Sequence, residues 1–306
     1  MQILQKKLKH GLITLSNLDK NEILQIVQHA QKFKDGYNTD SLSGRTIASL
    51  FFESSTRTRL SFETAIQKLG GNVIGFSEPS NTSLGSKNES IVDTLKIIGA
   101  YSDAIVMRHP NDGASKLAQE VLSIPIINAG DGGNLHPTQT LLDLFTIYET
   151  QGTLENINLA LMGDLKYSRT IRSLLEIAVL FNMKIFFIAD EVFYPNKQYL
   201  EILEHHNISY SFHDSISEVI SELDIMYITR LQKERFKQVS KKIKNLILEP
   251  QELATAKDNL RILHPLPRNE EIPITIDDTP YAYYFQQARN GLFVRMALLD
   301  IIMGEH

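Results

Sequence analysis

A group of hydroxyl and guanidinium side chains stands where a predicted strand meets a predicted helix. Within FFESSTRTRLSFETA (51–65) this group comprises Ser54, Ser55, Thr56, Thr58, Arg57 and Arg59. A helix N-terminus offers N–H groups and about half a positive charge, so hydroxyls and an arginine placed there can bind a phosphate dianion. Residues 57 and 59 lie about 200° apart around a helix. We therefore assign Arg57 to the ligand and Arg59 to structure or a subunit contact.

Two interpretations of this segment compete. Serine and threonine are favoured as caps at helix starts, so an isolated hydroxyl there is as easily structural as functional. Four hydroxyls together with an arginine favour a phosphate site. The sequence contains neither a G-x-x-x-x-G-K-[ST] loop nor a G-x-G-x-x-G fingerprint, so we expect the phosphate of a small molecule rather than of a nucleotide.

The elements that would position these residues are short apolar runs, each followed by a polar turn and a helical segment. This alternation is typical of parallel βαβ units and predicts an α/β fold. We expect strands at 46–52, 72–76, 104–108 and 124–129, and a second series at 158–163, 184–189, 208–213, 224–230 and 260–264. A helix predicted at 136–149 separates the two series. The amphipathic segment 291–304 predicts a last helix that returns to the first domain.

Ligands of parallel sheets bind beyond the carboxyl ends of the strands. The unusual polar residues follow predicted strands, which places them on one rim: Ser54 to Thr58, Ser83, Lys87, Arg108, His136, Gln139, Arg169, Arg230 and Gln232. Ser83 and Lys87 belong to a polar stretch, 77–90, that has no hydrophobic period. A loop of that length is expected to be a lid, a binding element or disordered.

The composition is that of an ordinary globular chain. Its 306 residues suffice for about two domains, and 42% hydrophobic with 22% charged residues excludes a disordered or membrane class. A net charge of −5 argues against a nucleic-acid partner. The absence of cysteine excludes disulfides, thiolate metal sites and a cysteine nucleophile. The N-terminus lacks a signal-peptide core and no apolar run is long enough for a membrane span, so we expect a cytoplasmic protein.

Segments along nearly the whole chain resemble, in order, the catalytic chain of the aspartate carbamoyltransferase family. They are FFESSTRTRLSFETA, NTSLGSK, VMRHP, GDGGNLHPTQTLLDLFTI, MGDLKYSRT, YITRLQKER, HPLPR and YFQQARNGLF. The resemblance implies two parallel-sheet αβα domains joined by two interdomain helices. Residues 1–136 with 292–306 would bind carbamoyl phosphate and residues 137–291 would bind aspartate. The implied reaction gives N-carbamoyl-L-aspartate and phosphate, for pyrimidine synthesis.

The resemblance also implies roles for particular residues around carbamoyl phosphate. Its phosphate would be bound by Ser55, Thr56, Arg57, Thr58 and Arg108. The carbamoyl oxygen would be polarised by Thr58, Arg108 and His136, as preorganised donors do for other oxyanions. The carbamoyl NH2 group would be held by Gln139 and by the backbone carbonyls of Pro265 and Leu266.

Aspartate carries two carboxylates, and arginine binds carboxylates in a planar, bidentate manner better than lysine does. The resemblance implies that Arg169 and Arg230 bind the two carboxylates of aspartate, assisted by Gln232, Lys87 and Leu266. It also implies that Ser83, which would bind carbamoyl phosphate, and Lys87 come from a neighbouring subunit, so the active unit would be a homotrimer with shared sites. MRHPNDGASKLAQE is similar to versions of the enzyme that assemble with a separate, zinc-carrying regulatory chain.

The implied chemistry needs no protein nucleophile and no cofactor. The neutral amine of aspartate would attack directly and the departing phosphate would accept the proton, with Arg57, Thr58, Lys87, Arg108 and His136 as catalytic residues. His136 taken alone would be interpreted as a cap or core histidine; at this strand end we expect it to act as a neutral hydrogen-bond donor. No metal is expected in this chain, because its nine histidines form no ligand-spaced cluster with cysteines.

Glu53 stands beside the phosphate segment. The family implies that it bridges to Arg169 and Arg235 when the two domains close, and the alternative is a solvated surface acid.

Three other classes of protein compete with the main interpretation: an ornithine carbamoyltransferase, a non-catalytic homologue acting as a scaffold, and a dehydrogenase-like nucleotide protein. Two features argue against an ornithine carbamoyltransferase. That family typically carries HCLP where this sequence has HPLP, and the predicted arginines would repel the cationic side chain of ornithine.

Overall fold

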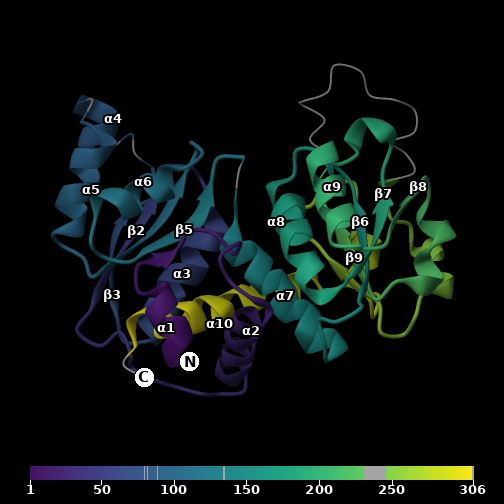
Figure 1. Ribbon diagram of the computed structural model, residues 1–306, viewed down its shortest axis with the longest axis horizontal. Coiled ribbons are helices and arrows are strands. Elements are labelled where there is room, and N and C mark those ends of the chain that lie inside the picture. Colours follow the sequence, from purple (N-terminus) through teal and green to yellow (C-terminus); the bar gives the residue numbers. More distant parts are fainter. Residues whose placement is uncertain (79, 81, 88, 134, 231–245, 305–306) are drawn as a thin grey trace. The chain divides into compact units, whose positions relative to one another are not determined.

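A computed structural model describes residues 1–78, 80, 82–87, 89–133, 135–230 and 246–304. The chain divides into two compact units, one formed by Met1–Phe145 with Arg289–His306 and the other by Thr146–Ala288. Both boundaries lie inside helices, the first within α7 (Pro137–Gln151) and the second within α10 (Tyr284–Met303). Each unit is described by itself below (Figure 1).

The first unit is built on a five-stranded parallel sheet. Its strand order is β1-β5-β4-β2-β3, formed by β1 (Gly11–Leu12), β2 (Thr46–Phe51), β3 (Asn72–Phe76), β4 (Ala104–His109) and β5 (Ile126–Asp131). The four strands expected here from the sequence are confirmed. β1 was not predicted, because two residues are too few to show a periodic pattern.

Helices cover both faces of this sheet. They are α1 (Gln2–Leu8), α2 (Lys20–Lys34), α3 (Thr56–Lys68), α4 (Ser83–Lys87), α5 (Ile91–Gly99), α6 (Ala114–Val121), the first part of α7 and most of α10. The stretch 77–90, expected to lack regular structure, contains the short helix α4. This expectation was wrong in that respect because five residues are too short for a visible hydrophobic period.

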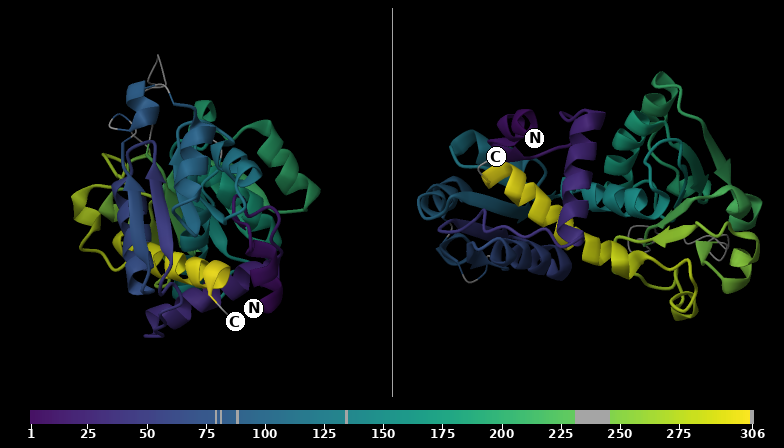
Figure 2. Two further views of the ribbon diagram at one scale, coloured as in Figure 1. Left: turned by 90° about the vertical axis from the view of Figure 1, so that its left-hand side faces the viewer. Right: turned by 90° about the horizontal axis from the view of Figure 1, so that it is seen from below.

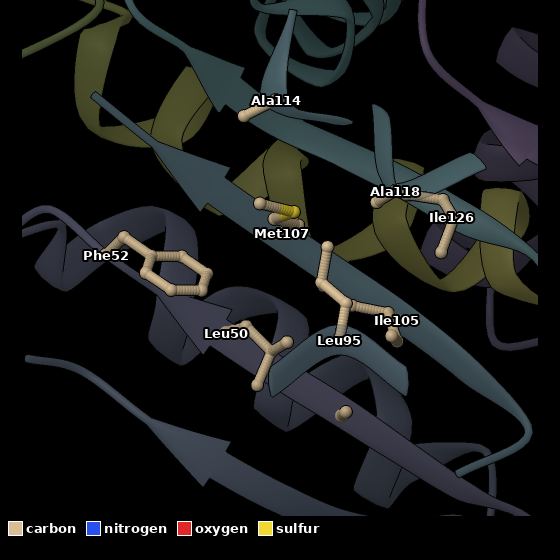
Figure 3. Packing of buried hydrophobic residues seen from close by; sticks show 9 residues of the cluster. Leu50, Phe52, Leu95, Ile105, Met107, Ala114, Ala118 and Ile126 are labelled. Carbon is tan, nitrogen blue, oxygen red and sulfur yellow. The ribbon is translucent and has the colours of Figure 1, made fainter. Parts of the chain in front are cut away.

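The period-2 alternation of side chains along the strands separates two layers of core. Ala48 and Leu50 face α5 and α6, whereas Ser49 faces the opposite side and donates a 3.0 Å hydrogen bond to Glu63 of α3. Figure 3 shows the first layer, formed by Leu50, Phe52, Leu95, Ile105, Met107, Ala114, Ala118 and Ile126. Burial of each large aliphatic or aromatic side chain stabilises the unit by about 1.5–3 kcal/mol.

The first helix, α1, and the last turn of α10 lie side by side in the first unit (Figure 2). Gln5 of α1 donates a hydrogen bond to the carbonyl of Gly304. Within α10, Asp300 is fully buried and its Oδ2 lies 2.6 Å from Nε2 of His29 in α2. The last helix is therefore anchored in the first unit by polar as well as apolar contacts.

The second unit contains another five-stranded parallel sheet. Its order is β10-β9-β6-β7-β8, formed by β6 (Asn158–Met162), β7 (Lys184–Ile188), β8 (Tyr210–His213), β9 (Ile225–Ile228) and β10 (Arg261–Leu263). All five strands predicted in this half are present. The sheet packs with α8 (Arg169–Ala178), α9 (Lys197–His205) and the 3-10 turns η2 (Val179–Phe181), η3 (Glu191–Phe193), η4 (Ile216–Glu218), η5 (Ile220–Glu222), η8 (Pro250–Thr255) and η9 (Ile274–Ile276).

Both sheets reverse their strand order at a defined point. In the first unit the chain leaves β2 for β3 on one side and returns to β4 on the other. In the second unit it leaves β6 for β7 and β8 and returns to β9. Such switch points leave a crevice outside the carboxyl ends of the two central strands, and ligands of open parallel sheets bind there. The α/β fold with two parallel sheets is thus confirmed.

In the part of the chain that the structure describes, no helix is both long enough and apolar enough to cross a membrane. The cytoplasmic location stays a prediction.

Candidate active site

The segment after β2 forms the N-terminus of α3, at the switch point of the first sheet. Ser55 is the N-cap residue with extended backbone (φ −158°, ψ 95°), but among the described residues its side chain makes no capping hydrogen bond. The hydroxyl is therefore not engaged as a helix cap. Thr58 is buried, at 7% exposure, whereas Arg57 is exposed. This geometry supports a ligand-binding role over the simple capping interpretation.

Arg59 is held on its own helix. Its Nη1 lies 3.6 Å from Oε1 of Glu63, one turn later in α3. The same carboxylate oxygen accepts the hydrogen bond from Ser49 of β2. Arg57 and Arg59 therefore differ as the helical spacing predicted, because Arg59 has a structural partner.

Arg108 is the residue before the last in β4, on the other side of the switch point, and its side chain is only 13% exposed. Its Nε lies 2.7 Å from Oε1 of Glu53, which follows β2. Its Nη1 lies 3.4 Å from Nε2 of His136. A guanidinium can only donate, so Nε2 of His136 can take part in this contact only as an acceptor. Glu53 thus pairs with an arginine of its own unit.

His136 and Gln139 belong to the start of α7. The carbonyl of His136 accepts hydrogen bonds from the backbone N–H groups of Gln139 (3.0 Å) and Thr140 (3.2 Å), and Pro137 occupies the first helical position as expected. The Gln139 side-chain amide donates to Oδ1 of the buried Asp143 at 2.8 Å. This contact directs the Gln139 amide oxygen away from Asp143, so that oxygen can accept a hydrogen bond from an NH2 group.

A glycine allows Arg108 and His136 to approach each other. Gly130 in β5 has φ +119°, and a Cβ atom there would lie 3.3 Å from Cδ2 of His136 and 3.5 Å from Nη1 of Arg108. L-residues with a side chain rarely adopt this backbone conformation. The identity of residue 130 therefore contributes to the geometry of the site.

In the second unit, Arg169 and Arg230 flank the switch point. Arg169 is the first residue of α8, which follows β6, and Arg230 lies just beyond β9. Both are partly exposed. The loop before α8 is ordered by a 3.0 Å hydrogen bond from the Tyr167 N–H to Oδ1 of Asp164. Two guanidinium groups placed in this way suit a ligand with more than one carboxylate.

Pro265 and Leu266 follow β10, at the same edge of the second sheet. Both are partly exposed, and Leu266 has φ +55°, a left-handed conformation that costs roughly 1–3 kcal/mol for a residue with a side chain. Its N–H donates a 2.8 Å hydrogen bond to Nδ1 of His264, which was not predicted to act at the site. The signal in the sequence was the dipeptide His264–Pro265, which repeats His109–Pro110 and His136–Pro137 at other strand ends.

The remaining predicted residues are distributed differently. Ser83 and Lys87 are the first and last residues of α4, four positions apart, and both are exposed. Figure 1 shows α4 beside α5 in the first unit. Gln232 and Arg235 lie outside the described residues. Within the described part of the chain, no group of three or more His, Asp or Glu side chains is arranged to hold a metal ion.

Comparison with known proteins accounts for both units. Residues 10–149 match the model of the aspartate/ornithine carbamoyltransferase carbamoyl-P binding domain, and residues 155–302 match that of the Asp/Orn binding domain. Together these two models cover nearly the whole chain. The chain belongs to the aspartate/ornithine carbamoyltransferase family and is a carbamoyltransferase.

Solved structures of aspartate transcarbamoylases are similar to this chain over almost its full length. The catalytic subunit from M. jannaschii is 40% identical, with 96% of this chain and 97% of that chain covered and a TM-score of 0.89. The enzyme from Trypanosoma cruzi in complex with carbamoyl phosphate is 36% identical, with 97% of each chain covered and a TM-score of 0.91. The same enzyme in complex with N-(phosphonacetyl)-L-aspartic acid gives 36% identity, 97% coverage of each chain and a TM-score of 0.90.

Proposed function

We propose that this chain is an aspartate carbamoyltransferase, which transfers the carbamoyl group of carbamoyl phosphate to the amine of L-aspartate and supplies pyrimidine synthesis. One observation carries the proposal. In each unit, two arginines predicted from the sequence flank the switch point of the sheet: Arg57 and Arg108 in the first, Arg169 and Arg230 in the second. The substrates are a phosphate dianion and a dicarboxylate, and each needs such a pair.

The first unit supplies the groups for carbamoyl phosphate. The backbone N–H groups at the start of α3 and the side chains of Ser55, Thr56 and Arg57 bind the phosphate. Thr58, Arg108 and His136 donate to the carbamoyl oxygen, where negative charge develops in the tetrahedral intermediate. For this role the proton of the neutral His136 ring must be on Nε2, so ligand binding must displace the contact of that nitrogen with Arg108.

The carbamoyl NH2 group and aspartate complete the reacting pair. Three acceptors hold the NH2 group: the amide oxygen of Gln139 and the carbonyls of Pro265 and Leu266. The guanidinium groups of Arg169 and Arg230 bind the two carboxylates of aspartate, assisted by Gln232, Lys87 and Leu266.

Catalysis follows from positioning and charge. The neutral amine attacks the carbonyl carbon, the C–N bond forms, and the C–O bond to phosphate breaks as the tetrahedral intermediate collapses. The proton lost by the amine passes to the departing phosphate, so no side chain needs to act as a nucleophile. Glu53 exchanges its contact with Arg108 for Arg169 and Arg235 when both substrates are bound.

We infer in addition that the active unit is a homotrimer with shared sites. Ser83 and Lys87 share one face of α4 and are exposed to solvent in the single chain, which supports their use by a neighbouring subunit. A separate, zinc-carrying regulatory chain is a further partner implied by the segment MRHPNDGASKLAQE.

One assay tests the function. Purified protein is mixed with carbamoyl phosphate and either L-aspartate or L-ornithine, and the carbamoylated amino acid is measured. We expect product with aspartate only, because two arginines repel the cationic side chain of ornithine. Product with ornithine alone would contradict the proposal, and no product with either amino acid would favour a non-catalytic homologue.

A further inference from the structure

The turn after β10 is fixed by a buried histidine. His264 is 2% exposed, and its Nδ1 accepts a 2.8 Å hydrogen bond from the N–H of Leu266. Its Nε2 lies 3.1 Å from Oε1 of Glu271, which is 4% exposed. The imidazole thus connects the middle of the turn to a carboxylate farther along the chain.

These contacts determine which nitrogen carries the proton. A backbone N–H can only donate, so Nδ1 of His264 must be the unprotonated nitrogen. The carboxylate of Glu271 can only accept while ionised, so Nε2 must carry the hydrogen. The ring is therefore neutral, and its two partners hold it in the tautomer that is protonated on Nε2. Burial alone would raise the pKa of the Glu271 carboxyl, but hydrogen bonds from His264 and Asn269 outweigh burial and lower that pKa.

Further hydrogen bonds tie this histidine to the surrounding backbone. Oε1 of Glu271 also accepts a 2.8 Å hydrogen bond from the N–H of Asn269. The N–H of His264 donates to Oε1 of Gln287 in α10 at 2.8 Å, and Gln287 is 1% exposed. Each end of the turn is thereby held by a buried side chain, and the carbonyls of Pro265 and Leu266 lie between these ends.

The hydrogen bond from the N–H of residue X to Nδ1 of the histidine in a His-Pro-X segment also occurs at another strand end. It is therefore a property of the local sequence. In His109–Pro110–Asn111, the N–H of Asn111 donates a 3.0 Å hydrogen bond to Nδ1 of His109. Proline has no N–H, so in a His-Pro-X segment the next available backbone donor is that of residue X. The His-Pro pair alone thus favours the turn, and the link from Nε2 to Glu271 distinguishes the turn after β10.

We propose that His264 is a positioning residue, which holds Leu266 in its left-handed conformation so that the carbonyls of Pro265 and Leu266 are aimed at the carbamoyl NH2 group. The proposal rests on the function proposed above for these two carbonyls. His264 itself touches no substrate. It acts as a fixed spacer between the N–H of Leu266 and the carboxylate of Glu271, and it does so as a neutral ring.

Two substitutions separate the roles of the two ring nitrogens. In His264→Asn, the amide oxygen can take the place of Nδ1 and accept from Leu266, while the link to Glu271 is lost. In His264→Gln, the longer amide reaches toward Glu271 and the acceptor for Leu266 is lost. We expect kcat of the asparagine variant to stay within about tenfold of the parent. We expect kcat of the glutamine variant to fall about 100-fold, because displaced carbonyls no longer orient the carbamoyl group. The exposed His205, changed to Asn, serves as the matched control and should keep the parent kcat.

The affinity for inorganic phosphate provides a second readout, since its ligands belong to the first unit. It should be unchanged in both variants of His264, whereas a general loss of fold would lower it. The proposal is overturned if the glutamine variant keeps the parent kcat, or if both variants lose the same fraction of kcat together with phosphate affinity.

A spectroscopic measurement decides the point independently of activity. In ¹⁵N-histidine-labelled protein at neutral pH, the signals that disappear in the His264→Asn variant should be those of an unprotonated Nδ1 and a protonated Nε2. The opposite tautomer, or a doubly protonated ring, contradicts the positioning role. A parent protein that shows the expected tautomer but carbamoylates neither amino acid would refute the proposed function and leave the role of His264 in the turn intact.

Discussion

Single residues at the edge of the first sheet have separable tasks. Arg57 and Arg59 are two positions apart, yet Arg59 is paired with Glu63 on α3 and Arg57 is exposed at the helix start. A surface i,i+4 ion pair is worth only about 0.3–0.5 kcal/mol. A charge-assisted hydrogen bond to a bound phosphate is worth about 1.5–3 kcal/mol. The two arginines should therefore respond very differently to the same substitution.

Arg57→Gln should raise KM for carbamoyl phosphate by roughly 10-fold to 150-fold, since it removes at least one charge-assisted hydrogen bond to the phosphate. Arg59→Gln is the matched control, with the same chemical change one helical face away. Initial rates at varied carbamoyl phosphate would measure both. If KM rises equally in the two variants, the assignment of Arg57 to the phosphate is wrong.

His109, next to Arg108, provides a test of stability against pH. Burial lowers the pKa of its imidazole from 6.5, and the nearby carboxylates of Glu53 and Asp131 only partly offset this effect. The unfolded chain then binds a proton more readily than the folded chain. The stability is fully present above the ordinary pKa of 6.5 and is lost progressively as the pH falls below it.

The variant His109→Asn keeps an acceptor for the N–H of Asn111 but does not titrate in this range. We expect the thermal midpoint of the parent to decrease more than that of this variant between about pH 8 and about pH 5. Differential scanning calorimetry at a series of pH values would measure the two slopes. Equal slopes would show that His109 is not the group responsible.

At the scale of elements, the first site depends on the close approach of β5 and the start of α7 to β4. Gly130 leaves space for the side chains of Arg108 and His136, and its φ of +119° is unfavourable for other residues. The backbone at the strand end thus belongs to the site as much as the side chains do. Displacement of a positioned group by about 1 Å can reduce a rate by a factor of about 100.

Gly130→Ala should therefore lower kcat/KM for carbamoyl phosphate by about 100-fold. Gly36→Ala is the control, since Gly36 also has a positive φ, +100°, but an added Cβ there would meet no atom within 4 Å. Both variants carry the cost of an unfavourable φ, so thermal unfolding should shift in both. A catalytic loss of the same size in the Gly36 variant would show that backbone strain alone explains the effect.

At the scale of the whole molecule, the two units share one arrangement but have different proposed ligands, a phosphate and a dicarboxylate. Each has a parallel sheet, a switch point and two arginines beside it. The exposed pair Ser83 and Lys87 on α4 extends this design to a neighbouring copy in the proposed trimer. A site assembled from two subunits can be tested by combining chains that are each inactive.

Mixed trimers of Arg108→Ala and Lys87→Ala chains should regain activity that neither pure trimer has. A site built from one chain's Arg108 and its neighbour's Lys87 carries neither substitution, so random mixing recreates some intact sites. The two proteins are dissociated, mixed and reassembled, and the carbamoyl aspartate formed is measured. Activity equal to the sum of the separate proteins would show that each site uses residues of one chain only. Sedimentation before and after mixing confirms that trimers have formed.

The sequence by itself determined the local elements and the family. Nine strands were predictable because buried parallel strands are continuous apolar runs, and the start of α7 was predictable because Pro137 suits a first helical turn. The hydroxyl and arginine residues after the first of these strands indicated a phosphate ligand, and the resemblance to the family implied which substrates bind. Serine and threonine at the start of α3 were ambiguous between capping and binding. The side chain of Ser55 makes no capping hydrogen bond among the described residues, and this observation favours binding.

Only the tertiary structure decided which residues meet across long sequence separations. The pair Glu53–Arg108, the contact Arg108–His136 and the hydrogen bond from His264 to Gln287 depend on side-chain directions that no periodic pattern encodes. The order of the strands within each sheet could not be predicted from the sequence either, because hydrogen bonding between parallel strands is set by the packing of helices on both faces. The types of the site residues could therefore be identified from the sequence. Their partners, protonation and orientation followed from burial and packing in three dimensions.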